Sequence, residues 1–181
     1  MRLVAFDLEC TSLSGMIGRI LCCSFKPVTP DRDGKVYTFR ADDEKYLFKD
    51  LTNDRKLAVA IRDELEKFDV IIGHNSKLFD RKFLNARLLK AGERAKASQW
   101  HFDTMWTVRT HLRASSKLDN VQKFLNLPNE KSPISWDDWQ RAAAGDSRAM
   151  AEVIDHCEAD VKVLEDAYWK LLPLQRTLTR D

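Results

Sequence analysis

The sequence predicts an α/β protein in which helices cover both faces of a mixed central sheet. Three strand-like segments open the chain, a helix and a short apolar strand follow, and most of the second half is helical in pattern. Helices between strands favour parallel pairing, so the sheet should join parallel strands to an antiparallel meander. The 181 residues have the length of one domain, and we expect a single unit over residues 1–181.

Five short apolar runs, bounded by turn residues, are the expected strands. The first three form the meander, with the DRDG sequence at 31–34 as the turn between the second and the third. The first strand is apolar on both faces, because Val4 and Phe6 alternate with Leu3 and Ala5, and such a strand is typical of a covered sheet centre. The strands are placed at residues 2–8, 19–26, 35–40, 70–72 and 100–103.

Helical periodicity follows in three places. Apolar residues at intervals of four predict a helix over 56–67, and a second helix is expected over 77–91, capped by Asn75 or Ser76. The stretch 128–145, which contains proline and tryptophan, is the least regular part. We expect it to form a loop over the functional site, whose candidate residues are given below. The last helix has a clean apolar stripe that consists of Met150, Val153, Ile154, Cys157, Val161, Leu164, Tyr168 and Leu171.

The composition is that of an ordinary globular protein, with 32% charged and 44% hydrophobic residues. Disordered and membrane-spanning classes are therefore not expected. The N-terminal MRLVAFDLEC places two acids directly after a short apolar run, which does not fit a secretory signal, so we expect a cytoplasmic protein without a membrane partner. The four cysteines form no CxxC pair, which favours buried free thiols over a zinc site or disulfides.

The net charge of +2 is small, but the charges are unevenly distributed along the chain. Residues 77–123 contain eleven Lys or Arg against four acids, whereas residues 130–166 contain ten acids against four bases. The plain interpretation is two sets of solvated helix faces. A basic segment beside a cluster of acids also suits a polyanion held next to bound metal.

Two acids end the first predicted strand. Asp7 and Glu9 are two residues apart, so their side chains leave the same face of the strand. At the end of a covered strand they would repel each other, and a cation is the simplest neutraliser. The alternative is a strand end that emerges into water, where acids cost little.

A third acid is expected early in the second helix. Asp80 shares a helix face with Leu84 and Leu88 near the buried side, although its negative charge could equally stabilise the helix N-terminus.

A further acid and a histidine lie on the last helix. Asp160 and His156 fall to the same side of the apolar stripe, one turn apart, and both are expected at its rim. The alternative is a surface pair worth a few tenths of a kcal/mol.

Five segments in order carry a resemblance to a known superfamily. They are FDLE at 6–9, IIGHNSKLFDRKFL at 71–84, FDT at 102–104, SSKLDNV at 115–121 and HCEADVKVL at 156–164. Together they span nearly the whole chain and resemble the DEDD exonuclease superfamily. The resemblance implies a ribonuclease H-like fold and a 3′–5′ exonuclease in which Asp7, Glu9, Asp80 and Asp160 hold two magnesium or manganese ions.

In the same family a His or a Tyr acts as general base, and His156 occupies that place. Imidazole titrates near neutral pH and suits the task. His-type members usually carry the base five positions before the last Asp, whereas His156 precedes Asp160 by four, the spacing of the Tyr branch. Asp155 and Glu158 do not keep the spacing of the ligands, and we leave them out.

The resemblance also suggests residues for substrate binding. The backbone after the first acids grips the terminal nucleotide in the family, so Thr11, Ser12 and Leu13 are expected to line that pocket; the alternative is a plain turn. His74 and Asn75 are candidates for substrate contact. The alternatives are that His74 packs locally and that Asn75 caps the helix that follows. Further candidates, each with an ordinary structural alternative, are Phe79 for base stacking and Lys117 for a phosphate contact.

The expected substrate is a single-stranded 3′ end, with DNA favoured over RNA, and a polymerase or other replication protein is a candidate partner. Two other functions compete with this prediction. One is a structure-specific endonuclease on the same fold, and the other is an inactive nucleic-acid-binding module.

Overall fold

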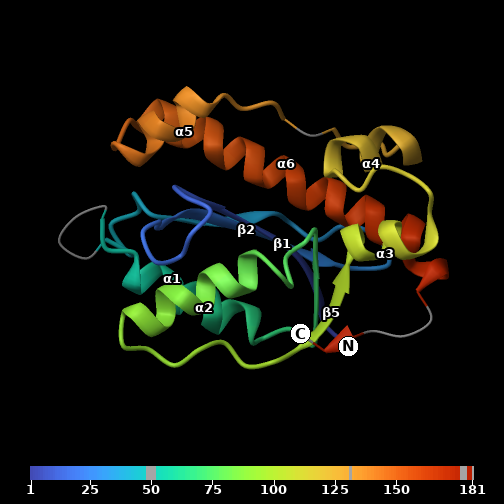
Figure 1. Cartoon of the computed structure of the whole chain (residues 1–181), viewed down its shortest axis with the longest axis horizontal. Coiled ribbons are helices and arrows are strands. Elements are labelled where there is room, and N and C mark those ends of the chain that lie inside the picture. Colours follow the sequence, from blue (N-terminus) through green and yellow to red (C-terminus); the bar gives the residue numbers. More distant parts are fainter. Residues whose placement is uncertain (48–51, 131, 176–178, 181) are drawn as a thin grey trace.

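A mixed sheet forms the centre of the computed structural model, which describes residues 1–47, 52–130, 132–175 and 179–180 (Figure 1). Within these residues the strand order is β3-β2-β1-β4-β5-β6. The β1–β4 and β4–β5 pairs are parallel, and the other neighbours are antiparallel. The strands are β1 (Leu3–Cys10), β2 (Ile20–Val28), β3 (Tyr37–Arg40), β4 (Val70–Gly73), β5 (Trp100–Asp103) and β6 (Thr179–Arg180).

Helices cover both faces of the sheet (Figure 1). One face is packed by α1 (Arg55–Leu65) and α2 (Asp80–Lys90). The long helix α6 crosses the other face, with the shorter helices beside it. These are α3 (Thr104–His111), α4 (Leu118–Leu125), α5 (Trp136–Ala143) and the 3₁₀ turn η1 (Leu172–Leu174). The expected mixed sheet with helices on both faces is therefore confirmed.

Strand β1 divides the core into its two layers. Val4, Phe6 and Leu8 pack towards α1 and α2, whereas Ala5 packs towards α6. All four are buried, and each large apolar side chain removed from water contributes roughly 1.5–3 kcal/mol. Because side chains alternate along a strand, Asp7 and Glu9 continue the face of Ala5 and meet α6.

The start of α2 differs from the prediction. The helix begins at Asp80 and its N-cap is Phe79, without a side-chain capping bond. Asn75 instead adopts a left-handed φ of 60°, and its carbonyl accepts the amides of Leu78 and Phe79. Ser76 is turned away to hydrogen-bond His101 Nε2 at 2.7 Å. Neither predicted cap therefore caps the helix, because both residues stabilise a separate turn between β4 and α2.

The stretch 128–145 is more regular than predicted, because it contains α5; residue 131 lies outside the described residues. The Ser135 side chain caps the helix by accepting the amide of Asp138 at 3.1 Å. Asp137 and Asp138 add negative charge to its first turn. This local start signal overrides the irregular composition around it.

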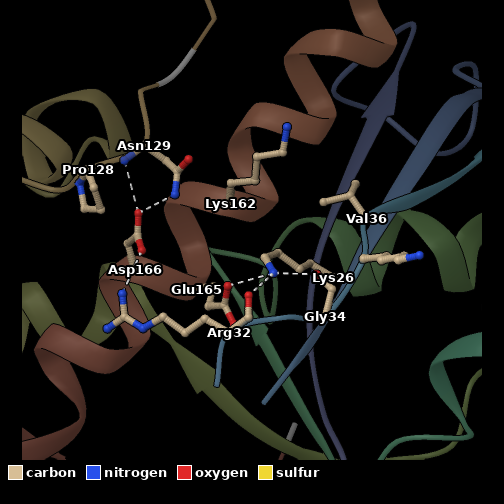
Figure 2. A pocket seen from close by; sticks show the side chains of 10 residues that line it. Lys26, Arg32, Gly34, Val36, Pro128, Asn129, Lys162, Glu165 and Asp166 are labelled. Carbon is tan, nitrogen blue, oxygen red and sulfur yellow. Dashed lines mark hydrogen bonds and ion pairs between the residues drawn. The ribbon is translucent and has the colours of Figure 1, made fainter. Parts of the chain in front are cut away.

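A polar network fastens the β2–β3 loop to α6, on the side of α6 next to β2 (Figure 2). Lys26 pairs with Glu165 at 2.9 Å, and its ammonium also donates to the Gly34 carbonyl at 2.6 Å. Arg32, at φ 58°, pairs with Asp166 at 3.3 Å. A Cβ at Gly34 would lie 1.9 Å from the Pro27 carbonyl oxygen, so only glycine allows this close approach.

All four cysteines are free thiols, and three of them are buried. Burial raises the pKa of the Cys10 thiol to about 12.

Across the described residues, none of the helices has the combination of length and apolar character that crossing a bilayer requires.

Candidate active site

The first part of the site is the C-terminal end of β1. Asp7 and Glu9 point towards α6, and the ligand atoms of Asp7, Glu9 and Cys157 all lie within 4.8 Å of one another. The Cys157 thiol donates to the Asp7 carbonyl at 3.4 Å and so fixes α6 against the strand. Two carboxylates and a thiol thus meet where the central strand ends.

Asp80 approaches the same place from the other side as the first residue of α2. It is buried, and burial raises the pKa of its carboxyl well above the usual range; the nearby charges of Asp7 and Asp103 act in the same direction. Hydrogen bonds to backbone groups of Asp80 and Leu8 partly offset this effect. A bound cation would reverse it, because the ionised carboxylate would then be the favoured form.

His156 and Asp160 complete the cluster from α6. The Nε2 atom of His156 lies 3.7 Å from Glu9 Oε1 and 4.0 Å from Asp160 Oδ2. Its Nδ1 atom hydrogen-bonds the Ser132 carbonyl, and the Trp139 ring meets the imidazole edge-on with centroids 5.5 Å apart. Since a carbonyl only accepts, Nδ1 carries the proton and Nε2 is the nitrogen that faces the acids.

His156 and Asp160 are buried, which excludes the alternative of a surface pair. The helical periodicity placed them correctly relative to the apolar stripe, all of whose members are buried. The segment around Ser132 and Trp139 covers the side of α6 that would otherwise be the rim. Burial strengthens every electrostatic interaction within the cluster.

The two neighbouring acids on α6 lie elsewhere. Glu158 accepts a 2.7 Å hydrogen bond from the Thr38 hydroxyl on β3, and Asp155 is exposed. Their positions agree with leaving them out of the ligand set.

The turn between β4 and α2 holds three of the substrate-binding candidates. His74 Nδ1 lies 2.8 Å from the Thr104 hydroxyl, and the backbone amide of Asn75 donates to Asp103 Oδ1 at 3.0 Å. Phe79 packs on the core, with its ring 6.1 Å from that of Phe83. Each candidate thus has a structural role, and these contacts also fix the turn that carries Asp80.

Of the other candidates, two are partly buried and two are exposed. Thr11 and Ser12 side chains accept the backbone amides of Arg19 and Ser14, so they shape the β1–β2 loop. Leu13 projects from this loop with 88% of its surface exposed. Lys117 is exposed at the N-cap of α4.

Several residues that position the site were missed by sequence reasoning. Asp103 caps α3 by accepting the amides of Met105 and Trp106, and it also holds the turn at Asn75. An acid before a helix is a recognisable capping signal, but nothing local shows that it reaches another loop. Cys157, Ser132 and Trp139 contribute through tertiary contacts that carry no local signal.

The strand order, the crossing helix and the acids at the end of the central strand define a ribonuclease H-like protein. The family model of the RNase H superfamily matches residues 4–172, and the chain belongs to this superfamily. A search of curated proteins finds no match.

Solved structures resemble the chain closely in fold. One is the family B DNA polymerase from the hyperthermophilic archaeon Pyrobaculum calidifontis, with a TM-score of 0.74 and 19% sequence identity. The likeness covers 96% of this chain and 25% of the polymerase chain, so the chain spans about a quarter of that protein's length. The predicted ribonuclease H-like fold is thereby confirmed, and family and fold together support a nuclease.

Proposed function

We propose that the protein is a metal-dependent 3′–5′ exonuclease that hydrolyses phosphodiester bonds at single-stranded nucleic-acid ends. The observation that carries the proposal is the pair of acids at the end of β1, Asp7 and Glu9, which Asp80 approaches from α2 and Asp160 from α6. Glu9 and Asp160 both flank His156 Nε2, and Asp7 is close enough to Asp80 to raise the pKa of its carboxyl. Asp80 and Asp160 are buried and Asp7 and Glu9 are partly buried, and a bound cation would neutralise such a group.

Asp7, Glu9, Asp80 and Asp160 would hold the cations. Their carboxylate oxygens are the hard ligands that Mg²⁺ and Mn²⁺ prefer, so the residues present fit this group. When bound, a pair of such cations supplies an activated water and stabilises the leaving 3′ oxygen. The acids themselves contribute the negative charge and the fixed geometry that favour divalent over monovalent cations.

His156 is proposed as the general base. Its Nε2 atom faces Glu9 and Asp160, and the Ser132 carbonyl fixes both the ring orientation and the tautomer. A water between His156 and the carboxylates would transfer a proton to Nε2 during attack on phosphorus. The four-residue spacing to Asp160 is that of the Tyr branch, and one helical turn places both side chains on the same side of α6.

The first experiment follows the shortening of 5′-labelled single strands with magnesium or manganese, and detects the released mononucleotides by chromatography. The wild type should shorten the strand from its 3′ end, and Asp7→Ala should abolish release while circular dichroism shows an unchanged fold. Comparing DNA and RNA strands of the same sequence shows whether the protein acts on deoxyribose or ribose substrates. We propose DNA, for which the likeness to a DNA polymerase is the support.

Three outcomes would contradict the proposal. Cleavage of a circular single strand would identify an endonuclease, because an exonuclease has no end to start from. Efficient removal of nucleotides from a blocked 3′ end would exclude the stated polarity. Binding without hydrolysis at any metal concentration would identify an inactive binding module.

A polymerase or replication partner belongs to the same proposal. Its support is again the likeness to a chain about four times as long that contains a polymerase. A proofreading role predicts faster release from a mismatched primer end than from a matched one in duplex DNA. Equal rates on both ends would favour trimming of free single strands.

A further inference from the structure

A hollow of about 850 Å³ is lined in part by Lys77 and Leu78, which lie just before Asp80 in the chain. One wall is the turn before α2, the second is one face of α3, and the third is η1. Along α3 the lining residues are Trp106, Thr107, Thr110 and His111, whose spacings of three and four residues place them on one helix face. The residues that matter here are Lys77, Leu78, Trp106, Thr110, His111 and Leu174.

The hollow is rigidly joined to the catalytic acids. Asp103, which lines it, accepts backbone amides from Asn75 at one wall and from Met105 and Trp106 at the other. The His74–Thr104 hydrogen bond adds a second link between the same walls. Lys77 and Leu78 precede Asp80 by three and two residues, so the rim of the hollow continues directly into the site.

The chemistry of the lining suits a nucleotide. Trp106 leaves 45% of its surface exposed although it lies on a helix whose neighbours Met105, Thr107 and Val108 are buried. An exposed indole beside aliphatic carbon offers a flat surface on which a base can stack. Lys77 and His111 at the rim are donors for a phosphate. Arg109 on α3 and Arg113 just after it add exposed positive charge.

We propose that this hollow binds a base of the single strand on the 5′ side of the bond to be cut, with Trp106 stacked on that base and Lys77 and His111 contacting its phosphate. The assignment to the substrate strand rests on the proposed exonuclease function, because that function places the 3′ end at the acids. Charge complementarity and the direct connection to Asp80 favour nucleic acid over a protein segment as the occupant.

The test measures binding of strands of increasing length to Asp7→Ala protein, which cannot digest them. Lengths from two to about ten nucleotides cover a binding site of the size that stacking platforms commonly have. Affinity should rise once a strand reaches Trp106, and Trp106→Ala should weaken binding of the longer strands by roughly tenfold, the loss of one stacked base. Dinucleotide binding should not change.

Trp100→Ala is the matched control, since Trp100 is 43% exposed at the start of β5 and is not one of the residues that line the hollow. It should bind every strand like its parent. Quenching of tryptophan fluorescence by the longer strands should disappear in Trp106→Phe. Equal losses in both alanine variants, or none in Trp106→Ala, would overturn the proposal.

Two further measurements complete the test. The first distinguishes a free mononucleotide from a strand as the ligand, and the second distinguishes failure of the exonuclease proposal from failure of the proposed binding site. If deoxynucleoside monophosphate alone quenches Trp106 as strongly as a strand does, the hollow is a mononucleotide site and the assignment to the strand is wrong. Hydrolysis of a nucleotide p-nitrophenyl ester, too short to reach Trp106, reports on the acids alone and should survive Trp106→Ala. If the wild type hydrolyses nothing but Trp106→Ala still loses strand binding, the exonuclease proposal fails and strand binding in the hollow stands.

Discussion

Asp80 is surrounded by groups that disfavour its negative charge. Its raised pKa, caused first by burial and then by Asp7, means that ionisation costs folding free energy when metal is absent. The stability that protonated Asp80 contributes is complete below the unfolded pKa of about 3.9 and is lost as the pH rises through the folded pKa. Asp80→Asn keeps the shape of the side chain and cannot ionise.

We therefore expect Asp80→Asn to melt a few degrees above wild type in chelator at neutral pH, since about 1 kcal/mol corresponds to roughly 2–4 °C in a chain of this size. Adding magnesium should raise the melting temperature of wild type and leave the variant unchanged. Asp155→Asn, on the exposed side of α6, is the control and should match wild type in both conditions. A variant less stable than wild type in chelator would contradict the electrostatic argument.

His156 is the second residue whose contacts define a test. His156→Gln retains a donor for the Ser132 carbonyl but has no group that titrates near neutral pH. We expect kcat to fall by about 10²–10⁴-fold, while KM and the rise in melting temperature with magnesium are retained. The acid side of the pH–rate profile should also flatten. Activity within a few-fold of wild type would mean that another group accepts the proton.

At the level of elements, the Lys26–Glu165 pair joins β2 to α6 within the core (Figure 2). Glu165→Ala would leave the Lys26 ammonium buried without its counter-ion, and we expect the free energy of unfolding to fall by about 3–5 kcal/mol. Lys26→Met combined with Glu165→Leu removes both charges and should recover most of that loss. Urea unfolding of the single and double variants measures the coupling.

The exposed Asp119–Lys123 pair on α4 provides the comparison for this ion pair. Asp119→Ala should cost at most about 0.5 kcal/mol, because water screens both charges. If Glu165→Ala costs no more than this control, the network does not hold the β2–β3 loop to α6.

The elements that could be predicted from sequence are those whose signal is local. The strand with apolar residues on both faces is the central β1, and the apolar stripe of α6 is buried as expected. A common site for Asp7, Glu9, Asp80 and Asp160 was implied by the resemblance that the five motifs carry, and it stays a prediction. Local periodicity alone did not reveal it.

What could not be predicted depends on contacts between distant segments. Asn75 and Ser76 are good capping residues, but neither caps α2. The backbone amide of Asn75 donates to Asp103, and the Ser76 hydroxyl hydrogen-bonds His101. The helical period placed His156 at a rim, and only the tertiary structure shows Trp139 and Ser132 covering it. The last short strand, β6, has too few residues for a period to be recognised.

At the scale of the whole molecule, the end that carries α3 and α4 has exposed cations. The segment with α3 and α4 carries the exposed cations Arg113 and Lys117, whereas α5 lies at the opposite end of α6 (Figure 1). A single strand should therefore approach from the α3–α4 end, and its affinity for Asp7→Ala protein should fall as salt rises.

Each phosphate contact to a single strand contributes about −0.7 to the slope of log K against log salt concentration. Arg113→Gln combined with Lys117→Gln should therefore make the slope shallower by about 1.4 and weaken binding at low salt for every strand sequence. Arg148→Gln removes an exposed cation near the start of α6, at the α5 end, and should leave the slope unchanged. Fluorescence anisotropy across a salt series measures all three proteins. Equal changes in slope for the double variant and Arg148→Gln would show that the strand senses only net charge, and the directional approach would be wrong.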